Sequence, residues 1–365
     1  MRQDQITVIY GDQPRRMIPE LLDAIDLTGE LKREYTIGIK PNLVLARESS
    51  SGATTDPELV EAIIVYLEER GYNNLVIMES SWIGDRTTRA YKVCGYEDIS
   101  RKYNVPLIDL KRDGYREVKV EDLTLKVCNK PLEVDYLINI PVLKAHCQTR
   151  LTCALKNLKG CIPDSEKRRF HTLGLHKPIA YLNAAIKTHL IIVDGIIGDL
   201  TFEEGGTPVQ MNRIIAGKDP VLVDAYAARL IGYDKDDIHY ISIAEQIGVG
   251  SADLSAASIK ELNTDAYKPA LIKAPRHVVA GLAAYVEEHD ACSACYGSLI
   301  HALERLRERG MLSRLKNKVF IGQGYKGKTG KGIGIGSCAR GFENCLTGCP
   351  PKARDIVEFL ENFLM

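Results

Sequence analysis

The sequence predicts an α/β protein: an N-terminal domain on a mostly parallel sheet with an antiparallel insertion, and a smaller α/β C-terminal domain. Short apolar runs rich in β-branched residues alternate with segments of helical period through most of the chain. An early strand, capped helix and strand form a βαβ unit, which joins parallel strands. Five of the ten cysteines lie in the last quarter of the chain, and this cluster of thiols predicts a metal site in the smaller domain.

The apolar runs place the predicted strands in order, and the run before Gly195 is the clearest of them. Strands are expected at residues 6–10, 35–40, 74–80, 105–110, 116–120, 136–140 and 190–194, with the antiparallel insertion at 208–216.

The helix between the second and third strands has clear boundary signals. Thr55 or Asp56 can cap it, Pro57 lies in its first turn, and Gly71 ends it. A later helix begins at Asp219-Pro220, with Asp219 as its cap. Further helices are expected at residues 87–103, 151–158 and 178–189, whereas a polar loop should follow Pro141 and a basic loop should cover residues 166–169.

Changes in composition divide the chain into three parts. Residues 1–260 form the predicted ligand-binding domain, and residues 261–277 are a polar, proline-containing linker. Residues 278–365 form the cysteine-rich domain, in which a helix carries a Cys-x-x-Cys motif near its start. A strand at 318–322, a glycine-rich loop and a helix at 353–363 complete it.

Charge and hydropathy narrow the range of partners. The 48 basic and 48 acidic residues cancel, so no field of one sign attracts nucleic acid or an anionic membrane. The first residues lack an apolar segment behind a basic start, and no stretch approaches the length of a membrane span. A cytoplasmic protein is therefore expected. Thiols stay reduced there, which favours metal binding over disulfides.

The C-terminal cysteines predict a 4Fe–4S cluster. Cys292 and Cys295 form a Cys-x-x-Cys pair, and Cys349 precedes Pro350 on a glycine-rich turn, a recurring arrangement for cluster ligands. We predict Cys338 as the fourth ligand and keep Cys345 in reserve, because Cys345 would give a Cys-x-x-x-Cys-Pro ending. Structural zinc and metal-free thiols remain alternatives.

Two other motifs are interpreted as structural. Gly322–Thr329 matches the phosphate-binding pattern Gly-x-x-x-x-Gly-Lys-Thr, but that motif needs a helix at its end and a glycine-rich run, residues 330–336, follows instead. The acidic, glycine-containing segment 194–206 could bind a divalent ion or act as a base, yet turn-forming Asp-Gly pairs explain it better.

Polar residues after two buried strands predict a binding pocket. Lys40 and Asn42 follow one strand, and Lys144 and His146 follow another, so both pairs should lie at the carboxyl edge of the sheet, where ligands bind. An anionic small molecule would suit this set. We assign catalysis to Lys144, His146 and His171, and ligand or cofactor binding to Lys40, Asn42, Lys156 and Asn157. The alternative is that these lysines only reach solvent and that the histidines are structural.

Together these motifs give the chain a family resemblance over nearly its whole length. They are Lys40-Pro-Asn42, Pro141-Val-Leu-Lys144-Ala-His146, Ala154-Leu-Lys156-Asn157-Leu-Lys-Gly160, Asp194-Gly195, Gly217-Lys-Asp219-Pro-Val-Leu-Val-Asp224 and Gly348-Cys349-Pro350-Pro351. The chain resembles domain-of-unknown-function family 362, and that family is distantly similar to the lactate racemase superfamily in its two-domain α/β layout. The resemblance implies an association with iron–sulfur clusters but no particular reaction, and the ferredoxin insert of some relatives is not evident here.

These features predict an iron–sulfur redox protein. Its cluster would exchange single electrons with an anionic small molecule or cofactor between the domains, and an electron-carrier protein is a candidate partner. One alternative is a hydroxy-acid dehydratase or isomerase in which a labile iron acts as a Lewis acid. Another is a binding protein in which zinc or a cluster only stabilises the small domain. The sequence does not predict an oligomeric state.

Overall fold

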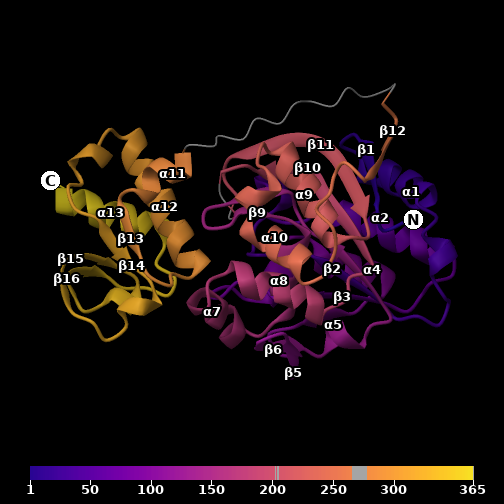
Figure 1. The fold of residues 1–365 in the computed structure, drawn as a ribbon, viewed down its shortest axis with the longest axis horizontal. Coiled ribbons are helices and arrows are strands. Elements are labelled where there is room, and N and C mark those ends of the chain that lie inside the picture. The colour runs from indigo at the N-terminus through magenta and orange to yellow at the C-terminus, as the bar shows by residue number, and fades with distance from the viewer. Residues whose placement is uncertain (202, 204, 265–277, 365) are drawn as a thin grey trace.

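The two largest sheets of the protein lie one in each of two units, as Figure 1 shows for the computed structural model, and two two-stranded sheets accompany them. The structure describes residues 1–201, 203, 205–264 and 278–364. The larger sheet has eight strands in the order β12-β1-β11-β10-β7-β2-β3-β4. Their bounds are Gln5–Tyr10 (β1), Ile37–Pro41 (β2), Leu75–Glu79 (β3), Leu107–Asp109 (β4), Tyr136–Ile140 (β7), Leu190–Asp199 (β10), Pro208–Gly217 (β11) and Ser258–Leu262 (β12).

Strand β11 runs antiparallel to both of its neighbours, β1 and β10, whereas the other pairs of this sheet are parallel. The mostly parallel sheet and its antiparallel insertion are therefore as the sequence predicts. Because β12 extends the sheet to Leu262, the predicted linker begins inside a strand. Its residues 265–277 lie outside the described part of the chain.

Helices cover both faces of the larger sheet, and each face has its own apolar core. One face is covered by Pro14–Ala24 (α1), Pro57–Glu69 (α2), Thr87–Val93 (α3) and Tyr96–Tyr103 (α4). The other is covered by Ala154–Asn157 (α6), Asp164–Thr172 (α7), His176–Ala185 (α8), Pro220–Leu230 (α9) and His239–Gln246 (α10). A short helix, Lys130–Glu133 (α5), precedes β7. None of the described helices is long and apolar enough to span a membrane.

The boundary signals of two helices are confirmed. The Asp56 side chain accepts a hydrogen bond from the Glu58 N–H at the start of α2. Asp219 accepts from the N–H groups of Val221 and Leu222 at the start of α9. Both helices have proline at the first position, where the missing N–H costs no helical hydrogen bond.

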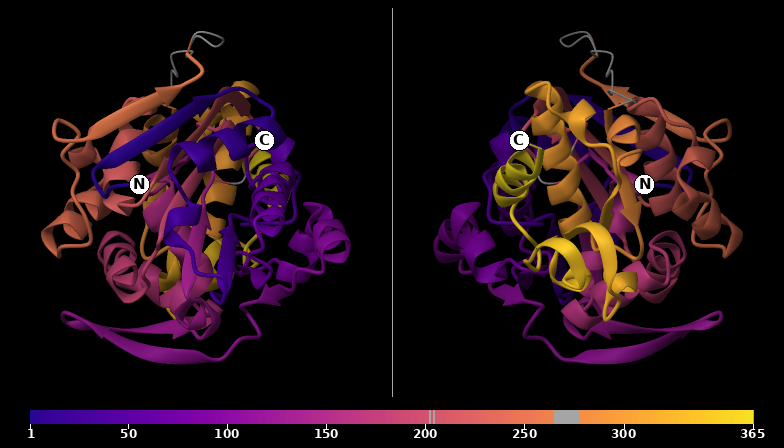
Figure 2. Two further views of the ribbon diagram at one scale, coloured as in Figure 1. Left: turned by 90° about the vertical axis from the view of Figure 1, so that its right-hand side faces the viewer. Right: turned by 90° about the vertical axis from the view of Figure 1, so that its left-hand side faces the viewer.

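Several local predictions need correction. The single helix expected at 87–103 is two helices, α3 and α4, separated at Gly95, whose φ of +81° a helix does not allow. The strand predicted at 116–120 is confirmed as β5, Tyr115–Val120, which pairs outside the large sheet with Leu123–Cys128 (β6), in the hairpin at the bottom of Figure 2. The loop expected after Pro141 contains a second hairpin, Lys144–His146 (β8) and Arg150–Thr152 (β9). The basic loop expected at 166–169 is part of helix α7.

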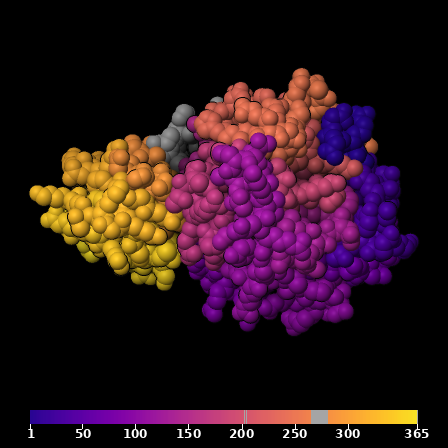
Figure 3. Space-filling view, turned by 60° about the horizontal axis from the view of Figure 1, so that its bottom comes forward, coloured from indigo at the N-terminus to yellow at the C-terminus, as the bar shows by residue number. Residues whose placement is uncertain are grey.

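The C-terminal unit has a four-stranded parallel sheet with its own core, formed largely by helices α12 and α13 against the strands. Its elements are Val278–Ala283 (α11), Val286–Glu288 (β13), Ser293–Glu308 (α12), Val319–Ile321 (β14), Gly330–Ile335 (β15), Phe342–Leu346 (β16) and Ala353–Leu364 (α13). Figure 3 shows this unit as a separate lobe against the larger one. No helix begins at Lys328-Thr329, in keeping with the structural interpretation of the glycine-rich run.

Candidate functional site

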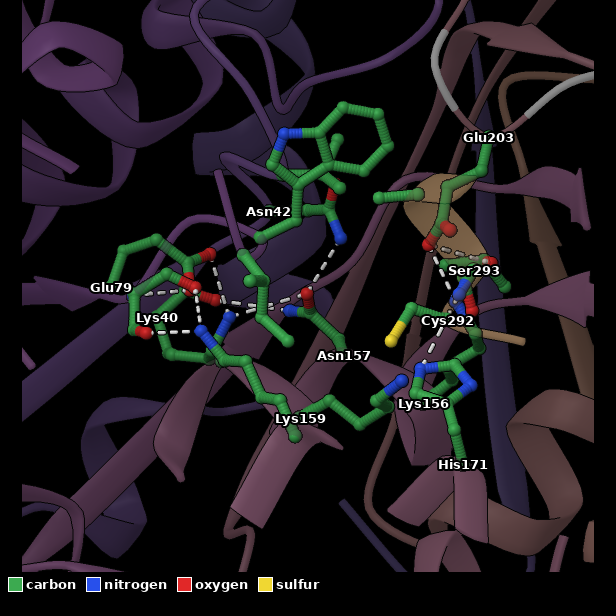
Figure 4. A pocket seen from close by; sticks show the side chains of 18 residues that line it. Lys40, Asn42, Glu79, Lys156, Asn157, Lys159, His171, Glu203, Cys292 and Ser293 are labelled. Carbon is green, nitrogen blue, oxygen red and sulfur yellow. Dashed lines mark hydrogen bonds and ion pairs between the residues drawn. The ribbon is translucent and has the colours of Figure 1, made fainter. Parts of the chain in front are cut away.

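A cavity of about 90 Å³ lies where the two units meet, and we call it the lysine cavity. Residues at the carboxyl ends of β2 and β3 and just after them line one part of it, and residues of α6, of the turn Leu158–Cys161 and of α7 line another. Cys292 and Ser293, at the start of α12, reach it from the C-terminal unit (Figure 4). Of the predicted pocket residues, the lining includes Lys40, Asn42, Lys156, Asn157 and His171.

The left part of the cavity in Figure 4 is a buried polar network centred on Lys40. The Lys40 ammonium lies 2.8 Å from Glu79 Oε2, donates to the main-chain oxygen of Pro41 at 2.8 Å, and donates to Asn157 Oδ1 at 3.2 Å. Asn42 Nδ2 also donates to Asn157 Oδ1, at 2.8 Å. Because all three ammonium hydrogens have partners, Lys40 can offer charge to a ligand but no free hydrogen-bond donor.

Glu203 forms the centre of a second network. Its Oε1 lies 2.5 Å from Lys156 Nζ, and its Oε2 lies 2.9 Å from His146 Nε2. Burial opposes the charge on Glu203, but Lys156 and His146 outweigh it and hold the pKa of this carboxyl well below its usual range. His146 Nδ1 accepts hydrogen bonds from the N–H groups of Gln148 and Thr149, so the ring proton belongs on Nε2, facing Glu203. Burial and the nearby Lys156 lower the pKa of His146 to about 4, and the ring is therefore neutral at pH 7.

Lys144 and His146 lie behind the lining of the cavity rather than in it. The Lys144 ammonium donates to Asn42 Oδ1, to the Ala53 carbonyl and to the Glu203 carbonyl. It thus ties the first network to the segment that carries Glu203. This position suits groups that orient cavity residues better than groups that contact a ligand, and the catalytic assignment of both residues stays a prediction.

The cavity includes two lysines that the sequence analysis did not select. Burial lowers the pKa of Lys167 to about 8, and its ammonium donates to oxygens of Ser80 and Ser81. Burial also lowers the pKa of Lys159 to about 7, with Lys156 nearby contributing. Within the described part of the chain, Lys159 has neither a hydrogen bond nor an ion pair. A sequence signal did exist, because Lys159 lies three residues after Lys156, a spacing that places both on one side of a helical segment.

His171 joins the two units at the cavity. Its Nε2 accepts a hydrogen bond from the N–H of Ser293 at 3.4 Å, and the Ser293 hydroxyl donates to Gln148 Oε1 at 2.9 Å. Gln148 in turn donates to the main-chain oxygen of Ala291 at 3.0 Å. Burial lowers the pKa of His171 well below its ordinary value, so the ring is neutral and can accept this bond.

Four of the five C-terminal cysteines line one further cavity, of about 370 Å³, which we call the cysteine cavity. They are the four predicted ligands, Cys292, Cys295, Cys338 and Cys349, whereas Cys345 lies on β16 and is not in the lining. None of the ten cysteines forms a disulfide. The described residues contain no group of three or more His, Cys, Asp or Glu side chains that could hold a metal ion. Cys292 lines both cavities, so they share a wall.

Part of this chain is similar in sequence to a known domain family and to a cyanobacterial protein. The sequence model of a domain of unknown function, DUF362, matches residues 37–229, which include the strand-end and α6–α7 residues of the lysine cavity but not the five C-terminal cysteines. The thylakoid-associated protein sll1697 of Synechocystis sp. is 24% identical over 222 residues, which are 58% of this chain and 67% of that protein.

Two solved structures are similar to this chain. The lactate racemase apoprotein from Thermoanaerobacterium thermosaccharolyticum has a TM-score of 0.39 and 12% identity over 67% of this chain and 58% of that chain. A Thermotoga maritima protein solved by a structural genomics consortium has a TM-score of 0.37 and 15% identity over 65% of this chain and 60% of that chain. The matching region therefore spans less than two thirds of either structure's own length.

Proposed function

The chain belongs to the DUF362 family, whose name states no activity, and we propose from the two adjoining cavities that it is an iron–sulfur redox protein. In this proposal the cysteine cavity holds a 4Fe–4S cluster, and the lysine cavity holds the anionic small molecule with which the cluster exchanges electrons. The observation that carries the proposal is the position of Cys292, which lines both cavities. A cluster ligand would then adjoin the bound molecule.

The residues of the cysteine cavity suit a cluster. Four thiols from three separate segments face one space among glycines, and all-thiolate ligation is what iron–sulfur clusters require. Arg168, Lys326 and Arg340 also line this cavity and would offset the negative charge of a cluster with thiolate ligands.

The lysine cavity suits a small anion. Four lysines and two glutamates line it, which leaves an excess of positive charge for a carboxylate or a comparable group. When bound, the cluster would supply or accept single electrons. The protein's own residues bind and orient the anion, and the neutral rings of His146 and His171 keep the Glu203 segment and the start of α12 in place.

The proposal also includes a cytoplasmic location and an electron-carrier protein as partner. Cys349 is exposed, so a partner protein could approach the cysteine cavity from this side. The basic residues that line the cavity would attract an electron-carrier protein with an acidic surface.

Anaerobic purification with iron and sulfide analysis, and absorption spectra before and after dithionite, would test the proposal. Iron and sulfide in equal amounts and a spectrum that bleaches on reduction are expected. Cys338→Ser should lose this spectrum, and Cys345→Ser is the matched control that should keep it. Zinc in place of iron, or loss of the spectrum in Cys345→Ser, would contradict the proposed ligand set.

The Lewis-acid alternative differs from the electron-transfer proposal in the number of cysteines that bind the cluster. It needs an iron with an open position, and the exposed Cys349 is the ligand that such a site would lack. A Cys349→Ser protein that retains a full cluster spectrum would favour a dehydratase or isomerase, whereas loss of the spectrum favours electron transfer.

A further inference from the structure

The four lysines of the lysine cavity differ in what their ammonium groups already bind. Lys40 donates to Glu79, to Asn157 and to a main-chain carbonyl. Lys167 donates to the carbonyl and hydroxyl oxygens of Ser80 and to the next carbonyl along the chain. An ammonium group has three hydrogens, so these two lysines have no N–H left for a ligand.

Lys156 and Lys159 are the two amines that remain available. Across the residues that the structure describes, Lys156 Nζ has one partner, Glu203, and Lys159 Nζ has none. Both line the cavity, and they follow one another at a helical spacing of three residues. Partial burial and neighbouring cations both favour the neutral form of a lysine amine, and Lys159 has no described partner that would stabilise its charged form. These are the conditions under which a lysine acts as a nucleophile.

We propose that Lys159 is a nucleophile that forms an imine with a small oxo acid bound in the lysine cavity. Its Nζ attacks the carbonyl carbon, and a proton moves from nitrogen to oxygen to give a carbinolamine. The Lys156 ammonium donates the proton with which the hydroxyl leaves as water, and it takes a proton back from the resulting iminium nitrogen. Amine and carbonyl thus give imine and water, and no oxidant or reductant is consumed.

Glu203 positions the Lys156 ammonium group for this proton transfer. Its carboxylate lies 2.5 Å from Lys156 Nζ, and His146 at 2.9 Å from the other oxygen fixes its orientation. Lys156 retains two further hydrogens, with which it can bind the substrate carboxylate.

The size and charge of the cavity restrict the substrate. With about 90 Å³ of space, the cavity suits a molecule of a few non-hydrogen atoms. When Lys159 is neutral, three lysine cations face two glutamates, and the remaining charge matches one carboxylate. A short 2-oxo acid or aldehyde acid meets both conditions.

This inference rests on the proposed function only in taking the same cavity as the substrate site, and it requires no cluster.

The test is reductive trapping. The full-length protein, purified anaerobically, is incubated with glyoxylate and cyanoborohydride, and peptides are then analysed by mass spectrometry for carboxymethyl-lysine. We expect modification at Lys159, and we expect excess acetate to suppress it there but not at surface lysines.

The cavity provides its own controls. Lys40 and Lys167 line the same cavity but have fully occupied ammonium groups, so they should stay unmodified. Lys159→Met matches the neutral side chain in length, cannot form an imine, and should lose the cavity label while its thermal midpoint stays near that of the natural protein. Labelling of surface lysines alone, or of Lys40 as strongly as Lys159, would overturn the inference.

Failure of this inference can be distinguished from failure of the proposed function. If acetate protects the cavity from a neutral lysine reagent but glyoxylate is not trapped, the cavity binds anions without imine chemistry, and only the inference fails. If the anaerobically purified protein contains no iron or sulfide but still traps glyoxylate at Lys159, the imine site stands and the redox proposal fails.

Discussion

Gly160 shows how little space surrounds the buried ion pair of Lys40 and Glu79. A Cβ at this position would lie 2.0 Å from Glu79 Oε1 and 2.7 Å from Lys40 Nζ. We expect Gly160→Ala to lower the free energy of unfolding by about 2 kcal/mol, because the pair and its network must shift within a packed core. Urea unfolding measures the change. Gly281→Ala is the matched control, since the added Cβ there meets no other described segment within 4 Å, and the stability should stay the same or rise.

His146 should make the protein sensitive to mild acid. Burial lowers its pKa from 6.5 to about 4, so between these values the unfolded chain binds a proton that the folded protein does not. Stability should therefore fall as the pH drops from 6.5 towards 4, by up to about 3 kcal/mol from this residue alone. His146→Gln should have a shallower dependence of unfolding free energy on pH. The same slope in His146→Gln and in the control His289→Gln, whose side chain is half exposed, would contradict this prediction.

The residues of the lysine cavity were only partly predictable. Lys40, Asn42, Lys156 and Asn157 follow from their place after strands of a parallel sheet or on the helix beyond, because topology brings such positions to one edge. The sequence does not show which ammonium groups will be engaged by other residues. For this reason the sequence alone does not single out Lys159, whose ammonium group has no hydrogen bond or ion pair among the described residues.

At the scale of secondary structure, helix α9 depends on its cap. Asp219 Oδ1 accepts from two N–H groups of the first turn, and Oδ2 accepts from the Ser251 N–H at 2.7 Å. We expect Asp219→Ala to destabilise the protein by about 2 kcal/mol, since it leaves three donors without a partner. Asp219→Asn keeps an oxygen for the cap and should cost less. Equal losses in the two variants, measured by chemical unfolding, would show that the charge rather than the cap is what matters.

Elements with strong local signals were predicted well, and elements fixed by tertiary contacts were not. Helix α2 has a cap, a first-turn proline and a terminal glycine within its own sequence. Helix α7 has a polar sequence, and its Lys167 is buried only because Ser80 and Ser81 of another segment accept its hydrogen bonds. Strand β8 likewise depends on pairing with β9, which no local pattern indicates.

At the scale of the whole molecule, the two units meet through specific polar and steric contacts. Ser293 contacts Gln148 and His171, and Gln323 Nε2 donates to the Arg168 carbonyl at 3.1 Å. Pro350 packs so closely on the segment around Gly84 that a Cβ there would lie 2.5 Å from its Cδ. These contacts flank the cysteine cavity, so whatever orders the cysteines should also order the junction between the units.

Iron removal should therefore affect the lysine cavity as well as the cysteine-rich unit. In the proposed iron–sulfur protein, chelation frees Cys292, which precedes Ser293 and the first turn of α12. We expect hydrogen exchange, followed by mass spectrometry, to increase in the first turn of α12 and in α7, which contacts it through His171. Helix α4 belongs to the core on the other face of the sheet and is the internal control. If exchange increased only around Cys338 and Cys349, the two cavities would be uncoupled, and the cluster would merely stabilise its own unit.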